Sequence, residues 1–271
     1  MNRLNKTLAA ARQEGRKALV TYIVNGDPVP DATLTTMHKM VEAGVDIIEL
    51  GVPFSDPMAE GPVIALGHER ALANKTTLTS TMAVVKAFRE TNNDTPVVLM
   101  GYANPVERMG YDRFADNASA AGVDGLLTVD LPPEEAEPLN QELKRVGIEN
   151  IFLLAPTTTG ERAKHIVDLA GGFVYYVSLK GVTGAGHLDV ASVEEKLSSM
   201  RELTDLPICV GFGIKDAATA KAIAKTADGA VVGSLLVDRM GSLADQPVEV
   251  IADEVVALIK PIRDGLDELK S

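Results

Sequence analysis

Two acidic residues, Glu49 and Glu60, have the surroundings that acid–base chemistry requires. Glu49 interrupts the apolar run 45–52, which has the composition of a buried strand, and Glu60 follows in a loop rich in proline and glycine. A carboxyl group in an apolar core must be paired, hydrogen-bonded or protonated, and each condition shifts its pKa towards values that suit proton transfer. The stretch is therefore the best candidate for acid–base chemistry, while a structural glutamate paired with lysine or arginine is the alternative.

Glycines end the last two apolar runs of the chain, at Gly211, Gly213 and Gly233, and Ser234 follows directly. Glycine allows the backbone to approach a ligand closely, and a short helix that began at Ser234 would direct its free N–H groups at an anion. These positions predict a phosphate site and therefore a phosphorylated small substrate. Ordinary turn and helix-cap chemistry is the alternative, because serine is a common cap.

The segment 179–187 contains three glycines and a threonine, with few apolar groups that could anchor it. We expect a lid that closes over the site, excludes water and brings Thr183 to the substrate. Lys180 in the same segment could form a Schiff base, but a solvated loop lysine is the plainer interpretation. The four histidines lack the spacing of a metal site, so no metal is predicted.

Short apolar runs, each followed by an amphipathic stretch, extend along the whole chain. The runs are almost continuously apolar, which is typical of parallel strands covered on both faces. The expected strands are 18–24, 46–52, 96–102, 125–130, 151–155, 173–178, 208–211 and 230–233. The expected helices between and after them are 30–42, 79–90, 111–121, 134–146, 160–169, 193–202, 216–226 and 246–266.

Eight such units predict a closed (β/α)₈ TIM barrel of the α/β class, with an additional N-terminal helix in 1–14 at its bottom. A doubly wound open sheet is the alternative. The number of units, the chain length and the lack of an opening Gly-x-Gly-x-x-Gly favour the barrel. No linker or change of composition divides the chain, so we expect a single domain over 1–271.

Alternation along the second expected strand separates its side chains into two sets, because successive residues of a strand point to opposite faces. Ile47, Glu49 and Gly51 share one face, and Ile48 and Leu50 lie on the other. If the Glu49 face points into the barrel, its carboxyl group lies near the top layer, where the active sites of this fold occur.

The composition describes a globular chain of 271 residues, 46% of them hydrophobic, with a formal net charge of −12 and no lysine- or arginine-rich run. This charge disfavours non-specific binding to nucleic acid or to an anionic membrane. The lack of a signal-peptide core and of a long apolar run predicts the cytoplasm. Cys209, the one cysteine, lies in an apolar segment and is expected in the core.

Five motifs together resemble the α subunit of tryptophan synthase, in order and over nearly the whole chain: 49–57, 101–105, 130–132, 181–184 and 211–214. The resemblance implies a TIM barrel that cleaves indole-3-glycerol phosphate to indole and glyceraldehyde 3-phosphate in tryptophan biosynthesis. It also implies that the chain itself has no cofactor. The implied partner is a β subunit that carries pyridoxal phosphate, in an α-β-β-α assembly.

The resemblance also implies roles for individual residues. Glu49 matches the general acid and base that protonates indole C3 and assists removal of the glycerol hydroxyl proton, and Glu60 would stabilise the indole ring at its N–H. The implied substrate-binding residues are Tyr22, Met100, Tyr102, Leu127, Val129, Tyr175, Thr183 and Phe212. The implied phosphate cradle is Gly184, Gly213, Gly233 and Ser234, and the implied partner contacts are Asp56, Pro57, Asn104 and Pro132.

The chain departs from the common family pattern at four positions. Glu60 stands where aspartate is usual, and the additional methylene moves its carboxylate by ~1 Å or more. Tyr22 stands where phenylalanine is frequent, Val129 where alanine is, and Leu179 where arginine is. Two other functions stay open: a binding subunit that activates its partner while its own chemistry is weak, and another phosphate-binding barrel such as an isomerase or synthase.

Overall fold

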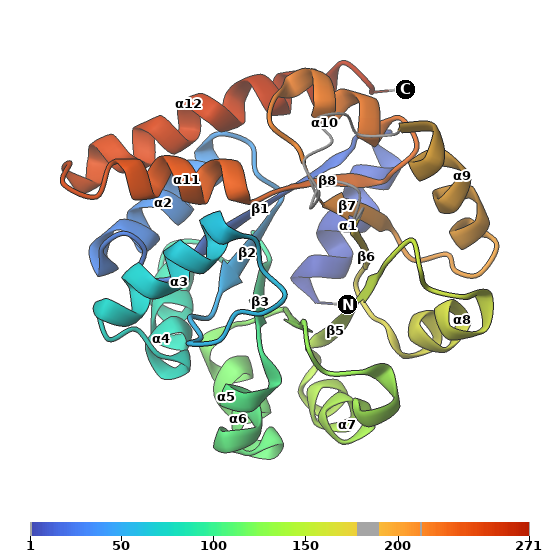
Figure 1. Ribbon diagram of the computed structural model, residues 1–271, viewed down its shortest axis with the longest axis horizontal. Coiled ribbons are helices and arrows are strands. Elements are labelled where there is room, and N and C mark those ends of the chain that lie inside the picture. The colour runs from blue at the N-terminus through green and yellow to red at the C-terminus, as the bar shows by residue number, and fades with distance from the viewer. Residues whose placement is uncertain (1, 178–189, 212, 271) are drawn as a thin grey trace.

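The computed structural model describes residues 2–177, 190–211 and 213–270. Within these residues, eight parallel strands pair in chain order and close into a barrel (Figure 1). The strands are β1 (Ala18–Val24), β2 (Ile47–Gly51), β3 (Val97–Gly101), β4 (Gly125–Thr128), β5 (Glu149–Leu154), β6 (Val174–Val177), β7 (Ile208–Gly211) and β8 (Gly229–Val232). The predicted (β/α)₈ barrel is confirmed, and the pairing of β1 with β8 excludes the open sheet.

Helices surround the barrel in Figure 1. Their bounds are α1 (Arg3–Gln13), α2 (Pro30–Glu42), α3 (Pro62–Ala73), α4 (Leu78–Arg89), α5 (Ala103–Met109), α6 (Tyr111–Ala121), α7 (Glu137–Val146), α8 (Gly160–Leu169), α9 (Val190–Arg201), α10 (Ala217–Ala224), α11 (Ser234–Ser242) and α12 (Val248–Asp267). One continuous helix was expected over 134–146. The structure instead has a 3-10 turn, η1 (Pro133–Glu135), followed by α7. The sequence did not predict α3 and α5, which both follow strands that bear site residues.

Side chains from alternate strand positions fill the inside of the barrel. They form one apolar cluster, consisting of Ala18, Val20, Ile47, Val98, Leu127, Ile151, Phe173, Cys209 and Val231 with Leu4 and Leu8 of α1. The opposite faces of the strands pack against the surrounding helices, where Ile48 and Leu50 belong to a separate, larger cluster. Ile47 therefore points inwards and Ile48 outwards, and Glu49 shares the inward face of β2. Cys209 is buried in the barrel interior, as predicted.

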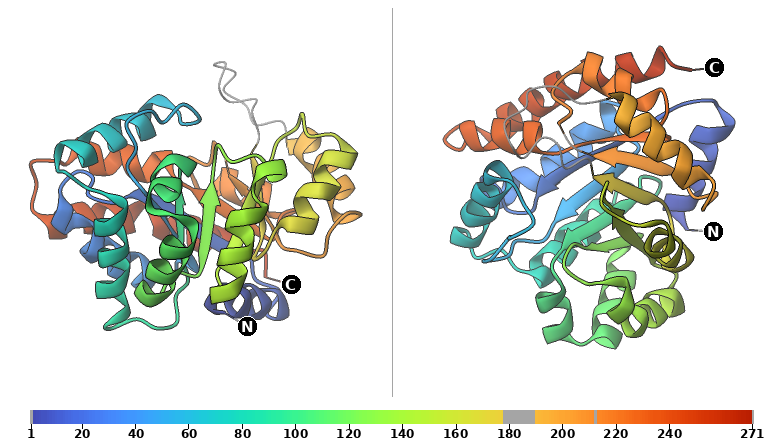
Figure 2. Two further views of the ribbon diagram at one scale, coloured as in Figure 1. Left: turned by 90° about the horizontal axis from the view of Figure 1, so that it is seen from below. Right: turned by 45° about the vertical axis from the view of Figure 1, so that its right-hand side comes forward.

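The helix α1 lies across one end of the barrel, and the loop between β2 and α3 lies at the other end (Figure 2, left). Leu4 of α1 reaches so close to Gly172 that a Cβ there would lie 2.6 Å from its methyl group, and Gly172 has a φ of 69°. Only glycine satisfies both conditions without strain. The additional N-terminal helix that the sequence predicted thus covers the bottom of the barrel.

Polar contacts hold α1 to residues at or just before the start of β4 and β5. Asn2 caps the helix and donates from its side chain to the carbonyl groups of Asp124 and Gly147, at 3.0 and 3.2 Å. Asn5 donates to the Glu149 carboxylate at 2.6 Å. These contacts hold α1 against the bottom of the barrel. The loops that follow the strands lie at the opposite end, which is where the active sites of this fold occur. None of the helices in the described part of the chain is long and apolar enough to cross a membrane.

Candidate active site

Glu49 projects into the barrel from β2, beside Tyr22 of β1 and Val98 of β3. Its side chain is fully buried, and no group among the described residues hydrogen-bonds either carboxyl oxygen. Among the described residues, Glu49 therefore has no lysine or arginine partner, which the alternative of a structural ion pair would require. Burial, with the charge of Glu60 as a second cause, raises the pKa of Glu49 to about 8. At neutral pH Glu49 holds a proton and can act as an acid.

Glu60 lies in the loop between β2 and α3 and is half-buried. Burial raises its pKa to about 7, and its charge contributes to the raised pKa of Glu49. Two interacting carboxyl groups titrate as a pair, so near neutral pH one holds a proton while the other is ionised. This arrangement supplies an acid and an anion in the same site.

The loop that carries Glu60 is attached to the barrel at both of its ends. Near its start, the backbone N–H of Phe54 donates to Nδ1 of His68 on α3, at 3.0 Å. The Phe54 ring stacks on Tyr102, with the ring centroids 4.8 Å apart. Near its end, the backbone N–H of Ala59 donates to the Tyr102 hydroxyl at 3.1 Å. Tyr102, expected as a substrate-binding residue, is thus also a support for the residue next to Glu60.

The structure brings the other described pocket residues together at one end of the barrel interior. Leu127 belongs to the interior cluster, and Met100, Val129 and Tyr175 pack against it while half-buried. Tyr22 forms an adjoining cluster that also contacts Met100. These side chains form an apolar set on the inner face of the barrel, the face to which Glu49 also points.

Two pocket tyrosines lie directly over glycines of the neighbouring strand. A Cβ on Gly51 would lie 2.4 Å from the hydroxyl oxygen of Tyr22, and a Cβ on Gly211 would lie 2.2 Å from that of Tyr175. Any larger residue at these two positions would displace the tyrosines. Gly211, which was expected to let a ligand approach the backbone, accommodates the Tyr175 side chain instead.

The predicted phosphate residues lie at the ends of two paired strands. Gly213 follows β7 and has a left-handed φ of 70°, and Gly233 follows β8 as the N-cap of α11. Ser234 is the exposed first residue of that helix. A Cβ on Gly233 would lie 3.3 Å from Cβ of Tyr22, so the start of α11 adjoins the pocket wall. An anion bound at the start of α11 would therefore lie next to an aromatic ring bound beside Tyr22.

Four of the residues expected in the site lie outside the described part of the chain. They are the substrate-binding residues Thr183 and Phe212, the phosphate residue Gly184, and Lys180, the candidate for a Schiff base. The same holds for Leu179, His187 and the expected lid.

The expected partner contacts come from loops and a helix that follow β2, β3 and β4, and they share the rim of the site. Asp56 and Asn104 are exposed, and Pro57 and Pro132 are half-buried. Met58, which was not among the expected contacts, is 85% exposed in the same loop as Asp56.

Asp130, which follows β4, has a structural contact. Its carboxylate accepts a hydrogen bond of 2.7 Å from the backbone N–H of Ala103, the first residue of α5. Asp130 therefore satisfies the N-terminus of α5.

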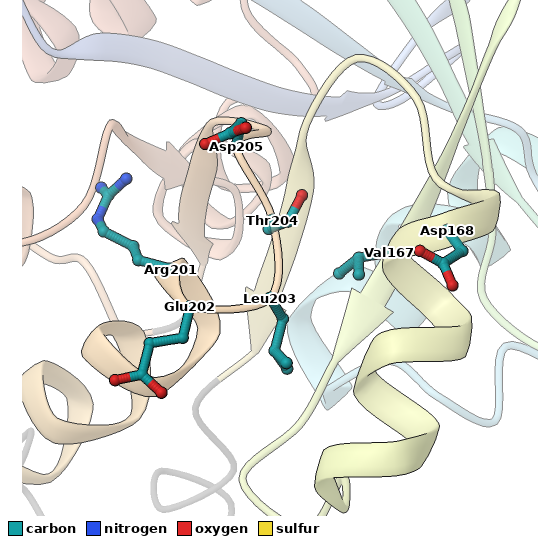
Figure 3. Close-up of a pocket in the computed structure, with 7 residues that line it drawn as sticks. All are labelled: Val167, Asp168, Arg201, Glu202, Leu203, Thr204 and Asp205. Carbon is teal, nitrogen blue, oxygen red and sulfur yellow. The ribbon is translucent and has the colours of Figure 1, made fainter.

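A hollow lies between the end of α8 and the turn that joins α9 to β7 (Figure 3). Its side chains are mostly polar, and Arg201 there is paired with Asp228 at 2.8 Å. The turn leads into the start of β7, which is the opposite end of the barrel from Glu49. This hollow is therefore separate from the candidate site.

A carboxyl pair that titrates near neutral pH, at the end of a TIM barrel where active sites occur, is suited to moving protons on a bound substrate. The class of protein that this defines is a TIM-barrel enzyme that works by acid–base chemistry.

Comparison with known proteins identifies the family. The family model described as tryptophan synthase alpha chain matches residues 8–265. The tryptophan synthase alpha chain of Marinobacter nauticus is 54% identical over 269 residues, which cover 99% of each chain, and that of Nitrosococcus oceani is 54% identical over 98% of each. The crystal structure of tryptophan synthase subunit alpha from Legionella pneumophila superposes with a TM-score of 0.92 at 41% identity, over 99% of each chain.

The chain therefore belongs to the tryptophan synthase alpha chain family. It is an enzyme of tryptophan biosynthesis, a lyase that cleaves indole-3-glycerol phosphate. Membership of this family also implies a beta-subunit partner.

Proposed function

We propose that Glu49 is the general acid and base of the cleavage of indole-3-glycerol phosphate. In the first step, protonated Glu49 donates its proton to C3 of the indole ring, which forms the indolenine cation. In the second step, the Glu49 carboxylate takes the proton of the glycerol hydroxyl group as the bond between C3 and the glycerol chain breaks. The bonding electrons return to the ring, indole and glyceraldehyde 3-phosphate leave, and Glu49 is protonated again.

Glu60 is proposed to stabilise the positive charge that develops on the indole N–H in the first step. An ionised carboxylate is required for this, and its pKa of about 7 allows ionisation while Glu49 still holds its proton. The family position usually holds the shorter aspartate, and the attachment of this loop through Phe54 and Ala59 is what sets the position of the longer side chain.

The indole ring is proposed to lie between Tyr22, Met100, Leu127, Val129 and Tyr175, with the phosphate group at the start of α11. The closeness of Gly233 to Tyr22 supports this, because it sets the anion site and the ring site side by side. Gly213 and Ser234 would complete the described part of the cradle. This division of the substrate leaves its glycerol chain facing Glu49, where the bond must break.

The single observation that carries the proposal is the buried carboxyl group of Glu49, which has no hydrogen-bond partner among the described residues. Burying such a group is costly, and perturbed carboxyl groups of this kind cluster at functional sites. The test measures indole release from indole-3-glycerol phosphate by Glu49→Gln, which should lower kcat by ~10²-fold or more. Glu202→Gln, at the opposite end of the barrel, is the matched control and should retain full activity. Wild-type kcat in Glu49→Gln would refute the proposal.

The partner is proposed to be a tryptophan synthase beta subunit that carries pyridoxal phosphate, joined in an α-β-β-α assembly on the rim formed by Asp56, Pro57, Asn104 and Pro132. The chain is proposed to need no cofactor of its own and to act in the cytoplasm. Indole release should therefore be measured with and without the beta subunit. A tight complex in which neither form releases indole would favour the alternative of a binding subunit that only activates its partner.

A further inference from the structure

His68 on α3 lies buried between two parts of the proposed active site. Only 1% of its surface is exposed. Its Nδ1 atom is 3.0 Å from the backbone nitrogen of Phe54, and its Nε2 atom is 3.3 Å from the hydroxyl oxygen of Tyr22. One imidazole ring thus contacts both the loop that carries Glu60 and a side chain of the pocket wall.

The contact with Phe54 decides which way each hydrogen bond runs. A backbone N–H can only donate, so Nδ1 of His68 must accept and cannot carry a proton. The neutral ring then carries its hydrogen on Nε2 and donates it to the Tyr22 oxygen. Burial lowers the pKa of His68 to about 4, which agrees with a neutral ring at neutral pH. The Tyr22 hydroxyl therefore accepts from His68 and has its own hydrogen free to donate.

The Tyr22 hydroxyl lies close to the acid pair. Tyr22 is in register with Glu49 on the next strand, and its oxygen rests over Gly51, two residues further along the same inward face. Burial and the charges of Glu60 and Glu49 raise the pKa of Tyr22 well above its ordinary value, so the phenol stays protonated. Because the Tyr22 oxygen already accepts from His68, its hydrogen remains available to donate to an acceptor in the site.

We propose that His68 is a positioning residue of the lyase, which orients the Tyr22 hydroxyl as a hydrogen-bond donor beside the acid pair and holds Phe54, and with it the loop of Glu60. This inference rests on the roles proposed above for Glu49 and Glu60. It assigns a function to two residues, Tyr22 and His68, through a contact that a phenylalanine at position 22 could not make. The ring acts through other residues and does not touch the substrate itself.

Two substitutions separate the two contacts of the ring. In His68→Asn the side-chain oxygen can replace Nδ1 and accept from Phe54, while the contact with Tyr22 is lost. In His68→Gln the longer amide can replace Nε2 and donate to Tyr22, while the contact with Phe54 is lost. His68→Phe loses both. Each is compared with wild type and with Tyr22→Phe for kcat and KM of indole-3-glycerol phosphate cleavage, after circular dichroism has shown that the variant is folded.

We expect His68→Phe to lower kcat by ~10-fold to 100-fold, since ~1 Å of displacement at a catalytic group costs this much. His68→Asn and His68→Gln should each recover part of this loss. Tyr22→Phe should lower kcat in the wild-type background and have no further effect in His68→Phe. Independent, multiplying effects of the two substitutions, or wild-type kcat in folded His68→Phe, would overturn the proposal. His38→Gln, on the outer helix α2, is the matched control and should keep wild-type kcat.

A measurement without substrate tests the geometry even if a variant does not fold. In protein with ¹⁵N-labelled histidine, the nitrogen shifts of His68 should be those of the neutral ring protonated at Nε2, and should not change between about pH 6 and pH 8. A ring protonated at Nδ1 would overturn the proposal. If Glu49→Gln kept full activity while His68 showed the expected tautomer, the fault would lie with the proposed function and not with the position of His68.

Discussion

Glu49 lowers the stability of the fold at the pH at which it works. Its carboxyl group is fully buried without a hydrogen-bond partner among the described residues, and its pKa is about 8 where an ordinary glutamate has 4.5. Below pH 4.5 the group is neutral in both folded and unfolded chains. Between pH 4.5 and pH 8 the unfolded chain loses the proton and the folded chain keeps it, so stability falls as pH rises through this window.

Glu49→Gln should therefore gain stability relative to wild type as the pH rises. The amide cannot ionise, so the difference in free energy of unfolding should shift in favour of the variant by roughly 3–5 kcal/mol between about pH 4.5 and pH 8.5. Urea unfolding at a series of pH values measures it. A difference that stays constant with pH would show that Glu49 is not buried as a neutral acid. The same variant is expected to be inactive, so stability and activity change in opposite directions.

The pH dependence of catalysis should reflect the acid pair. The reactive form has Glu49 protonated and Glu60 ionised, and with pKa values of about 8 and about 7 it is most abundant between those values. We expect a bell-shaped profile of kcat/KM with limbs near these two pKa values. In Glu60→Gln the acidic limb should disappear. The alkaline limb should move to lower pH, because the charge that raises the pKa of Glu49 is gone.

Steady-state rates of indole release in buffers of constant ionic strength give both profiles. An alkaline limb that stays in place in Glu60→Gln would mean that the two carboxyl groups do not interact. Unchanged indole formation at all pH values would mean that Glu60 has no part in the reaction.

At the scale of the elements, the pocket depends on strands that end in glycine. A methyl group on Gly211 of β7 would meet the Tyr175 hydroxyl at 2.2 Å and its ring carbons at 2.5 and 2.6 Å. Gly211→Ala should therefore displace Tyr175, lower the free energy of unfolding by ~1–3 kcal/mol and lower kcat/KM. The cost should shrink in the double variant Tyr175→Ala/Gly211→Ala, where the ring is absent.

Thermal unfolding and indole assays of the single and double variants measure this effect. Gly160→Ala is the control, because nothing lies within 4 Å of a Cβ at the start of α8. Equal losses in Gly211→Ala and Gly160→Ala would show that the backbone, and not the contact with Tyr175, responds to alanine.

The strands could be predicted from the sequence because most are nearly continuous apolar runs, and β1 and β7 match the expected bounds. Alternation along β2 grouped Glu49 with Ile47, but which of the two faces points inwards came from the structure. The helices α3 and α5 were missed. The helix α5 has only seven residues, and Pro105 within it suggests a break in a helix. The structure tolerates Pro105 because it lies in the first turn, where its missing N–H would have no partner within the helix. In α3, the first residues are all apolar and Gly67 lies in the middle, so the sequence does not show the alternation of apolar and polar faces that is typical of a helix.

That omission limited the prediction of the site. His68 lies on α3, so its contacts with Tyr22 and Phe54 could not be foreseen from sequence spacing. The position of Glu60 depends on where its loop is attached, which is decided by side chains from two other elements and not by the residues of the loop. The residue types that do chemistry were therefore recognisable, while their mutual arrangement was not.

At the scale of the whole molecule, one end of the barrel is covered by α1 and the other carries both the site and the expected partner contacts. Met58 at that rim is 85% exposed. Met58→Asp should weaken binding of the beta subunit by ~10-fold or more, because a charge would have to be desolvated in the interface. The free energy of unfolding should not change, since the side chain packs little within the chain.

Isothermal titration calorimetry with the beta subunit measures the affinity. Leu203→Asp is the control, since Leu203 is 36% exposed at the hollow on the opposite end of the barrel (Figure 3). Equal weakening by both substitutions, or none by Met58→Asp, would contradict the assignment of this rim to the partner. That residues 1–271 fold as a single domain stays a prediction.

The contacts of α1 have a consequence for the order in which the molecule is assembled. This helix precedes all eight strands in the chain, yet Asn2 binds the carbonyl groups of Asp124 and Gly147, and Asn5 binds Glu149. A chain that emerges from the ribosome N-terminus first cannot seat α1 until β4 and the start of β5 have followed. During synthesis, α1 therefore waits until half of the strands have been made.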